Sequence, residues 1–339
     1  VKTTDFVVES FEPGYMKSLG LGYEELEKIN PGVIMTSITP FGQTGPYAHY
    51  KASDLVGEAM AGMQRLFGDP DRAPVRIGQP QFYFQGGLHG ALGSMMAFYH
   101  REMTGEGQHV DVSAQQGTTL QLMIAAEIWD VLKMNYRGLA TRMMTIRPPG
   151  APPLEMHLIW PCKDGHVIFM VGGGELGAAR SSKNMVEFAN ENGHALELKD
   201  FDWIGSWDTS KMNQEDFDRV MNPIKEFMLT KTKMELFEGA TRFEKEIRLA
   251  PCNTAKDVLE FPQYLAREFF EKVEHPELGE TFPYPGWPVK LWGPGITPIM
   301  PHRFQRRAPL IGEHNEEIYQ KELGISKEEL VLLKTQGVI

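Results

Sequence analysis

Short apolar runs alternate with amphipathic stretches over the first part of the chain. The runs at Phe6–Val8, Val33–Ile38 and Gln108–Val112 predict strands. The second run is apolar or β-branched at almost every position, which is typical of a strand covered on both faces. Between the strands the pattern predicts helices, at Tyr23–Ile29, Ser53–Met63, Gly86–His100 and Ala114–Lys133. Strands that alternate with helices indicate an α/β layer fold.

Three glycines share one side of the predicted Gly86–His100 helix. Gly86, Gly90 and Gly93 follow one another at i, i+4 and i+7, although each glycine in a helix costs about 1 kcal/mol relative to alanine. The spacing therefore indicates that something approaches this side of the helix closely. The sequence leaves open whether that is a ligand or a neighbouring backbone, or only a tightly packed second helix.

The rest of the chain differs in character. A stretch rich in proline and glycine, Pro148–Pro153, marks a domain boundary. After it, two predicted strands flank the hairpin signal Asp164-Gly165. Helical patterns follow, so this part predicts an α+β domain. Beyond Pro262 further prolines forbid long helices, until Ser326 begins a capping box at the last helix.

Composition narrows the range of functions. The chain has 34 Lys+Arg and 45 Asp+Glu, a formal charge of −11, which argues against non-specific binding of nucleic acid. Its two cysteines, Cys162 and Cys252, cannot form a disulfide framework. We expect no signal peptide, and no apolar stretch approaches the roughly 18 residues of a membrane span. We therefore expect a cytoplasmic protein without a membrane or nucleic-acid partner. Because the chain begins almost at once with a strand pattern, we also expect upstream elements to be missing.

Few motifs in the chain carry chemistry. Gly172–Gly177 spells G-x-G-x-x-G, but it follows the second arm of a predicted hairpin, so a glycine turn is favoured over a dinucleotide site. The ten histidines show no metal-binding spacing, and no Gly-x-Ser-x-Gly elbow occurs. Lys17, Lys51, Arg72 and Arg76 lie beside glycine and proline turns. They can hold a phosphate-bearing ligand or form a solvated surface, and spacing alone favours the surface.

Several stretches stand in a characteristic order along the chain: Val8–Gly14, Leu19–Tyr23, Asn30-Pro31, Phe41–Pro46, Gly68–Pro70, Thr104–Ser113 and Arg307–His314. In this order they resemble class III CoA-transferases, a family that includes formyl-CoA, carnitinyl-CoA and benzylsuccinyl-CoA transferases and α-methylacyl-CoA racemases. The resemblance implies a large Rossmann-like domain made of residues 1–125 and 262–339, with its first βαβ unit missing here. It also implies a linker at 126–153, a smaller α+β domain at 154–261, and two chains threaded together as an interlocked dimer.

The chemistry of this family depends on one aspartate. Its carboxylate attacks the acyl-CoA carbonyl to form a mixed anhydride, and the freed thiolate converts this into an enzyme–CoA thioester. Counted back from the glycine pair that begins at Gly86, this sequence has Tyr83 at that position, and Pro74–Gly93 contains no Asp or Glu. A phenol has no carbonyl carbon to carry CoA, so we expect no catalytic residue in this chain. The histidine of the racemase branch is also replaced, by Ser53.

The binding residues are better retained than the catalytic ones. The resemblance assigns Ser10, Phe11, Lys17, Ser18 and Lys51 to CoA, although serine at residue 10 departs from the usual asparagine. It implies CoA or an acyl-CoA as substrate, with no prosthetic group and no metal. The chain would then be a silent subunit that needs a related, aspartate-bearing partner. Together they would move CoA between succinyl-CoA and a carboxylic acid of the succinate type, such as benzylsuccinate.

Other functions stay open at this point. One is a racemase, isomerase or dehydratase that acts on CoA thioesters, with Tyr83 or His89 as the acid–base group. Another is a non-catalytic scaffold protein. A nicotinamide oxidoreductase is supported only by the Gly172–Gly177 motif.

Overall fold

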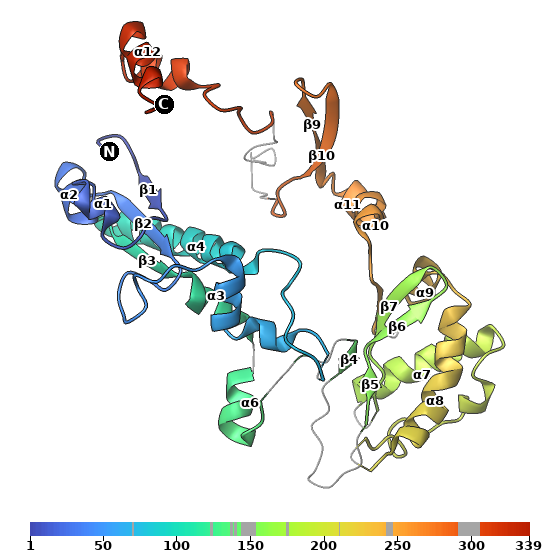
Figure 1. The fold of residues 1–339 in the computed structure, drawn as a ribbon. Helices are drawn as coiled ribbons and strands as arrows, with labels where there is room; N and C mark the ends of the chain where they lie inside the picture. Colours follow the sequence, from blue (N-terminus) through green and yellow to red (C-terminus); the bar gives the residue numbers. More distant parts are fainter. Residues whose placement is uncertain are drawn as a thin grey trace. The chain divides into compact units, whose positions relative to one another are not determined.

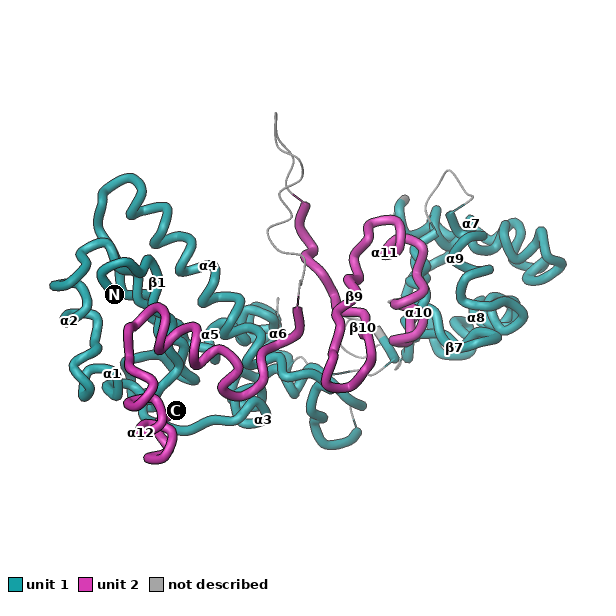
Figure 2. Tube along the Cα trace, turned by 90° about the horizontal axis from the view of Figure 1, so that it is seen from above, with its two compact units in different colours: residues 1–251 teal, residues 252–339 magenta. Residues whose placement is uncertain are grey.

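The computed structural model (Figure 1) describes residues 1–69, 71–122, 125–135, 138, 141–143, 154–173, 176–209, 211–241, 247–290 and 306–339. The chain forms two compact units, Val1–Pro251 and Cys252–Ile339 (Figure 2). The predicted domain division at 1–125, 126–153, 154–261 and 262–339 stays a prediction, and the Pro148–Pro153 stretch lies outside the described residues. In the part described, no helix is long and apolar enough to cross a membrane.

A parallel three-stranded sheet lies at the centre of the N-terminal part of the first unit. Its strands, in spatial order, are β1 (Phe6–Glu9), β2 (Ile34–Thr39) and β3 (His109–Ser113). Each begins within one residue of its predicted position. Five of the six residues of β2 are buried, as expected for a central strand with both faces covered. This confirms the α/β prediction for this part of the chain.

Helix α4 (Gln81–Thr104) runs along β2 and β3 and covers one face of the sheet (Figure 1). A Cβ atom built on Gly90 would lie 2.6 Å from Cδ1 of Ile38, and one on Gly93 would lie 2.7 Å from Cγ1 of Val110. These glycines therefore let the helix backbone pack directly on the sheet. At both positions the group that approaches closely is a strand side chain, neither a ligand nor a second helix.

The opposite face of the sheet carries a small apolar cluster. Side chains alternate between the two faces of a strand, so Met35 and Ser37 point away from α4. Met35 packs with Leu26 and Val33, and Val7, Met16 and Tyr23 pack against them. These residues join the sheet to α1 (Tyr15–Ser18) and α2 (Tyr23–Ile29). The two short helices are thereby placed next to the loop that follows β1.

The predicted Ala114–Lys133 helix is divided in the structure. Its pieces are α5 (Ala114–Thr119), η2 (Leu120–Leu122) and α6 (Ala125–Leu132). Thr118 and Thr119 donate their hydroxyls to the carbonyl groups four residues earlier, at 2.8 and 2.9 Å. Such bonds bend and slightly destabilise a helix, which accounts for the early end of α5.

The larger of the two apolar clusters lies in the α+β part of the first unit. This part holds the antiparallel strands β6 (Ile159–Cys162), β7 (Gly165–Phe169) and β8 (Leu249–Pro251), the pair β4 (Arg142–Met143) and β5 (Met156–His157), and α7 (Leu176–Glu191), η3 (Leu196–Leu198), α8 (Gln214–Leu229) and α9 (Lys233–Thr241). Cys162 pairs with Gly165, which confirms the predicted hairpin. Gly172 binds the Ser182 hydroxyl through its own N–H and C=O groups. Gly174 and Glu175 of the glycine motif lie outside the described residues.

The second unit contains a hairpin that the proline pattern does not reveal. Its elements are α10 (Ala255–Glu260), α11 (Pro262–Ala266), β9 (Phe270–His275), β10 (Glu280–Pro285), η4 (Glu316–Glu322) and α12 (Lys327–Thr335). Pro283 and Pro285 lie within β10. A strand at the edge of a sheet tolerates proline, because its outward-facing N–H groups need no partner strand. The Ser326 hydroxyl accepts a hydrogen bond from the Glu329 N–H at 3.2 Å, which is the serine half of the predicted capping box at α12.

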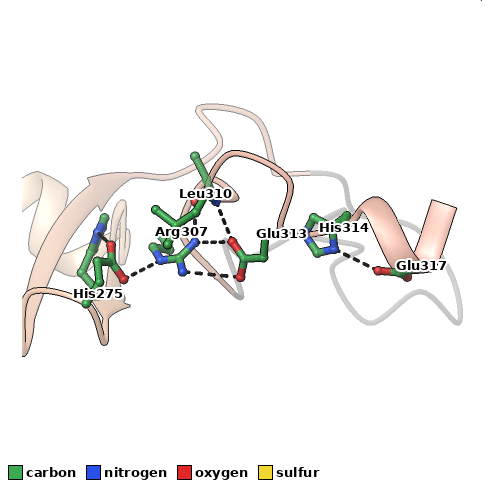
Figure 3. A network of polar contacts seen from close by, with 8 residues as sticks. His275, Arg307, Leu310, Glu313, His314 and Glu317 are labelled. Atoms are coloured by element: carbon green, nitrogen blue, oxygen red, sulfur yellow. Dashed lines mark hydrogen bonds and ion pairs between the residues drawn. The ribbon is translucent and has the colours of Figure 1, made fainter. Parts of the chain in front are cut away.

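Arg307 joins this hairpin to the segment that precedes η4 (Figure 3). Its guanidinium donates to Glu277 at 2.6 Å and to Glu313 at 2.7 Å. Hydrogen bonds from Arg307 and from the Leu310 N–H lower the pKa of Glu313. Burial pulls the pKa of Glu277 upward, but hydrogen bonds from its own backbone, Arg307 and His275 outweigh burial and hold it below its usual value. Charged groups therefore fasten this segment to the hairpin.

Candidate functional site

The loops that follow β1 and β2 meet at the carboxyl edge of the parallel sheet. Glu9 ends β1 and accepts a hydrogen bond from the Phe11 N–H at 2.7 Å, while Ser10 between them is exposed. Glu12 Oε1 lies 3.3 Å from Nζ of Lys51, which follows the loop after β2. Ligands of open α/β sheets bind at this edge. Three of the predicted binding residues, Ser10, Phe11 and Lys51, thus lie in the loops at this edge of the sheet.

Helix α1 supplies the other two predicted binding residues. Lys17 Nζ lies 2.9 Å from Oε2 of Glu24 on α2. This contact raises the pKa of Lys17 and lowers the pKa of Glu24, so both side chains stay charged near neutral pH. Ser18 donates its hydroxyl to the Tyr15 carbonyl at 2.7 Å, within α1. The Phe11 ring lies beside that of Tyr15, with 4.9 Å between the ring centroids.

A cavity of about 170 Å³ opens beside Lys17. Ser37 and His109 line it, with Ser37 Oγ 2.9 Å from His109 Nε2. The His109 ring stacks on Tyr23, at 5.6 Å between centroids. Burial raises the pKa of Tyr23, and nearby glutamates add to the effect, so its hydroxyl stays protonated. The cavity therefore offers both donors and acceptors to a polar ligand.

A row of polar residues crosses the sheet beside this cavity and is missed by sequence reasoning. Glu9 pairs with Ser37, and Ser37 pairs with Asp111. Asp111 in turn accepts a hydrogen bond from the Gln43 N–H at 3.0 Å. In the structure Glu9 is only 8% exposed. The one sign of this row in the sequence is that a glutamate directly follows the apolar strand pattern. The register that aligns the row cannot be read from one sequence.

Tyr83 lies in the first turn of α4 and is 55% exposed. The preceding residue, Phe82, is buried, and its N–H donates to Oδ1 of Asp54 at 3.1 Å. Asp54 is the first residue of α3 (Asp54–Met60), and its Oδ2 lies 3.5 Å from Arg76. The Asp54 carboxylate is therefore committed to holding the start of α4.

Glu58 is the second acid on this face of α3, one turn after Asp54. Its side chain is fully buried, and neither carboxylate oxygen has a hydrogen-bond partner among the residues that the structure describes. Helix α3 packs tightly on α4 at Gly57, where an added Cβ would lie within van der Waals overlap of the Phe82 ring. Neither acid of α3 presents an exposed carboxylate next to Tyr83.

Arg72 and Arg76 are the two arginines that the sequence offers for a phosphate-bearing ligand. Each forms an ion pair with an aspartate, whereas Lys17 and Lys51 pair with glutamates. Arg72 lies 3.8 Å from Asp69, and Arg76 lies 3.5 Å from Asp54. Ser53 occupies the N-cap position of α3 without a side-chain hydrogen bond to the helix. Within the described ranges, no group of three His, Cys, Asp or Glu side chains is placed to hold a metal ion.

The comparison with known families gives the class of enzyme. The chain belongs to CoA-transferase family III, whose family model matches residues 1–315. Members of this family use CoA thioesters as substrates.

Named relatives agree with this class. The chain is 33% identical to subunit BbsE of succinyl-CoA:(R)-benzylsuccinate CoA-transferase from Thauera aromatica, over 93% of this chain and 72% of that protein. It is 30% identical to succinyl-CoA–D-citramalate CoA-transferase of Chloroflexus aurantiacus, over 100% of this chain and 77% of that protein. The crystal structure of a CAIB/BAIF family protein from Brucella suis shares the fold, with a TM-score of 0.69, 23% identity, and coverage of 94% of this chain and 76% of that one.

Proposed function

We propose that this chain is the non-nucleophilic subunit of a class III CoA-transferase. The enzyme would move CoA between succinyl-CoA and a carboxylic acid of the succinate type, such as benzylsuccinate. Tyr83 is the observation that carries the proposal, because an exposed phenol stands in the first turn of α4 where the family resemblance places the nucleophilic aspartate. The relative BbsE is itself named as a subunit of a benzylsuccinate CoA-transferase, which supports a division of labour between chains.

The reaction needs a carboxylate that can become an acyl group. In the mechanism that the resemblance implies, an aspartate oxygen attacks the acyl carbonyl of the thioester, the C–S bond breaks, and thiolate leaves a mixed anhydride behind. The thiolate then attacks the aspartyl carbonyl, which releases the acid as a carboxylate and leaves CoA on the enzyme as a thioester. The second acid reverses these steps. A tyrosine side chain has no carbonyl carbon, so the aspartate must come from a related partner subunit.

The acids packed behind Tyr83 do not replace the aspartate. A nucleophile must come within about 3–3.5 Å of the carbon that it attacks. Asp54 binds the Phe82 N–H and Arg76, and Glu58 is fully buried. Neither carboxylate is open to a thioester in this structure.

The edge of the sheet carries groups that suit CoA binding. Lys17 and Lys51 supply ammonium groups for phosphates, and the exposed ring of Phe11 supplies a flat face on which a base can stack. Ser10 and Ser18 complete the residues that the resemblance assigns to CoA. The Rossmann-like large domain and the interlocked dimer belong to the same proposal.

The acid–base alternative relies on Tyr83 or His89, and the structure uses the second of these, His89, in packing. Its Nδ1 lies 2.9 Å from the Gln85 carbonyl oxygen. An added Cβ at Gly117 of α5 would lie 2.8 Å from the same nitrogen, so this edge of the ring packs against α5. The ring thus fills the contact between α4 and α5.

Co-expression with a related, aspartate-bearing subunit tests the proposal. We expect the chain alone to give no CoA transfer from succinyl-CoA to benzylsuccinate, and the pair to give it. Hydroxylamine trapping should modify an acid of the partner and none of this chain. Tyr83→Phe in the pair is the control and should keep the activity. Transfer by this chain alone, or trapping at Asp54 or Glu58, would overturn the proposal.

A further inference from the structure

The two lysines of the candidate CoA site already hold carboxylates. Lys17 Nζ lies 2.9 Å from Glu24, and Lys51 Nζ lies 3.3 Å from Glu12. The two glutamates come from different elements, α2 and the loop after β1, yet both line the cavity of about 170 Å³ beside Lys17. An anionic ligand must displace these carboxylates before it reaches the ammonium groups.

We infer that Glu12 and Glu24 keep the carboxylic-acid substrate away from the lysines that hold the phosphates of CoA. The inference rests on the proposed function, in which one enzyme handles both a CoA thioester and a free dicarboxylate. An ammonium group without a partner would bind a carboxylate of succinate as well as a phosphate. A protein can reject a wrong ligand by placing groups that compete with it or repel it.

Displacement favours phosphate over carboxylate. When a substrate carboxylate replaces a protein carboxylate on a lysine, one charge of −1 replaces another, so the exchange gains little. A phosphate monoester carries about −1.5 to −2 charges and three strong acceptor oxygens. It therefore gains more from the ammonium group than the glutamate loses.

The positions of the two ion pairs also favour CoA over a small anion. Lys17 lies on α1 and Lys51 follows the loop after β2, so the two ammonium groups belong to separate elements. A ligand with phosphates at two separate points, as in CoA with its 3′-phosphate and its pyrophosphate, displaces both glutamates in a single binding event and gains from linking the two contacts.

The surroundings strengthen the rejection of weaker anions. Glu9, Glu12 and Glu24 line the cavity together with Lys17, in a chain whose formal charge is −11. The mutual contact of Lys17 and Glu24 raises the pKa of the lysine and lowers the pKa of the glutamate. This pair therefore stays ionised over the neutral range, and the competition persists there.

Titration calorimetry of the full chain with CoA, with and without succinate, tests the inference. In the unchanged chain, succinate should not alter the dissociation constant of CoA. In Glu12→Gln/Glu24→Gln the affinity for CoA should rise about two- to fivefold for each pair removed, since exposed ion pairs are individually weak. Succinate should then compete with CoA. Glu27→Gln/Glu106→Gln is the matched control, because it removes the same charge from two exposed glutamates near Tyr23.

The outcomes separate the inference from the proposed function. If the unchanged chain binds CoA but succinate competes with it equally in all variants, the inference is overturned and the proposed function stands. The same holds if the double variant and its control bind CoA with equal affinity. If a folded chain, verified by circular dichroism, binds no CoA in any variant, the proposed function fails and the inference fails with it.

Discussion

Replacement of Gly90 by alanine tests whether direct contact between helix and sheet stabilises the element that carries Tyr83. The new methyl carbon would lie 2.6 Å from Cδ1 and 3.1 Å from Cγ1 of Ile38, whereas non-bonded carbon atoms pack at about 3.5–4.0 Å. Ile38 lies in the central strand, so either its rotamer changes or α4 moves outward. Overpacking of this kind costs about 1–3 kcal/mol.

Gly87 provides a matched control on the same helix. Among the described residues outside its own helical turns, no atom lies within 4 Å of the place where its Cβ would stand. Gly87→Ala therefore gains the helix propensity of alanine, about 1 kcal/mol. Gly90→Ala gains the same propensity but adds the overlap with Ile38. The two variants should differ by about 1–3 kcal/mol in the free energy of unfolding, with Gly87→Ala the more stable.

Urea unfolding followed by circular dichroism measures this difference, and hydrogen exchange of the α4 amides locates it. Exchange is the decisive readout because the chain has two compact units, and a single unfolding transition cannot be assumed. Exchange reports the local opening of α4 in either case. Equal free energies for Gly87→Ala and Gly90→Ala, with equal protection of α4, would refute the argument.

Three further predictions concern buried or paired carboxylates. Asp54→Ala removes the acceptor of an N–H in the first turn of α4 and should lower the free energy of unfolding by about 1–3 kcal/mol in urea; an unchanged midpoint would contradict this. Glu58→Gln should raise the urea midpoint, because a buried carboxylate without a partner among the described residues is costly when ionised, and a lower midpoint would count against it. The pKa values of Glu277 and Glu313 lie below the usual 4.5, so the stability that these carboxylates contribute is present above pH 4.5 and is lost as the pH falls through their lower folded values. Arg307→Gln should weaken this acid dependence of amide exchange in β9 and β10, and an unchanged dependence would argue against the network.

The strands of the sheet could be placed from sequence because their signal is local. In β2 almost every residue is apolar or β-branched, and the structure buries it between α4 on one face and α2 on the other. The start of α4 has no such signal. Pro80 precedes its first residue without a side-chain capping bond, and the first turn is held by Asp54 from another helix. A helix stabilised at its start by a tertiary contact begins earlier than its own sequence indicates, here at Gln81.

The candidate site could likewise be predicted from sequence only in part. Lys17 and Lys51 could be singled out from short motifs, but Glu12 meets Lys51 only because β1 and β2 are adjacent and parallel, so that the loops after them leave the same edge of the sheet. Ser37 and His109 are 72 positions apart in the sequence, and they meet through the pairing of β2 with β3. Contacts of this kind depend on strand order and register, which hydrophobic periodicity does not specify.

The residue at position 83 can change without disturbing the fold that presents it. The Tyr83 side chain is mostly exposed, and its ring meets that of Phe82 edge-on at 6.2 Å. The backbone of this turn is fixed from behind, by the Asp54 carboxylate and by the close packing of α3 on Phe82. The scaffold that would aim a nucleophile is therefore independent of the nucleophile itself. In the proposed subunit, tyrosine in place of the aspartate would remove the covalent step and leave the surrounding structure in place.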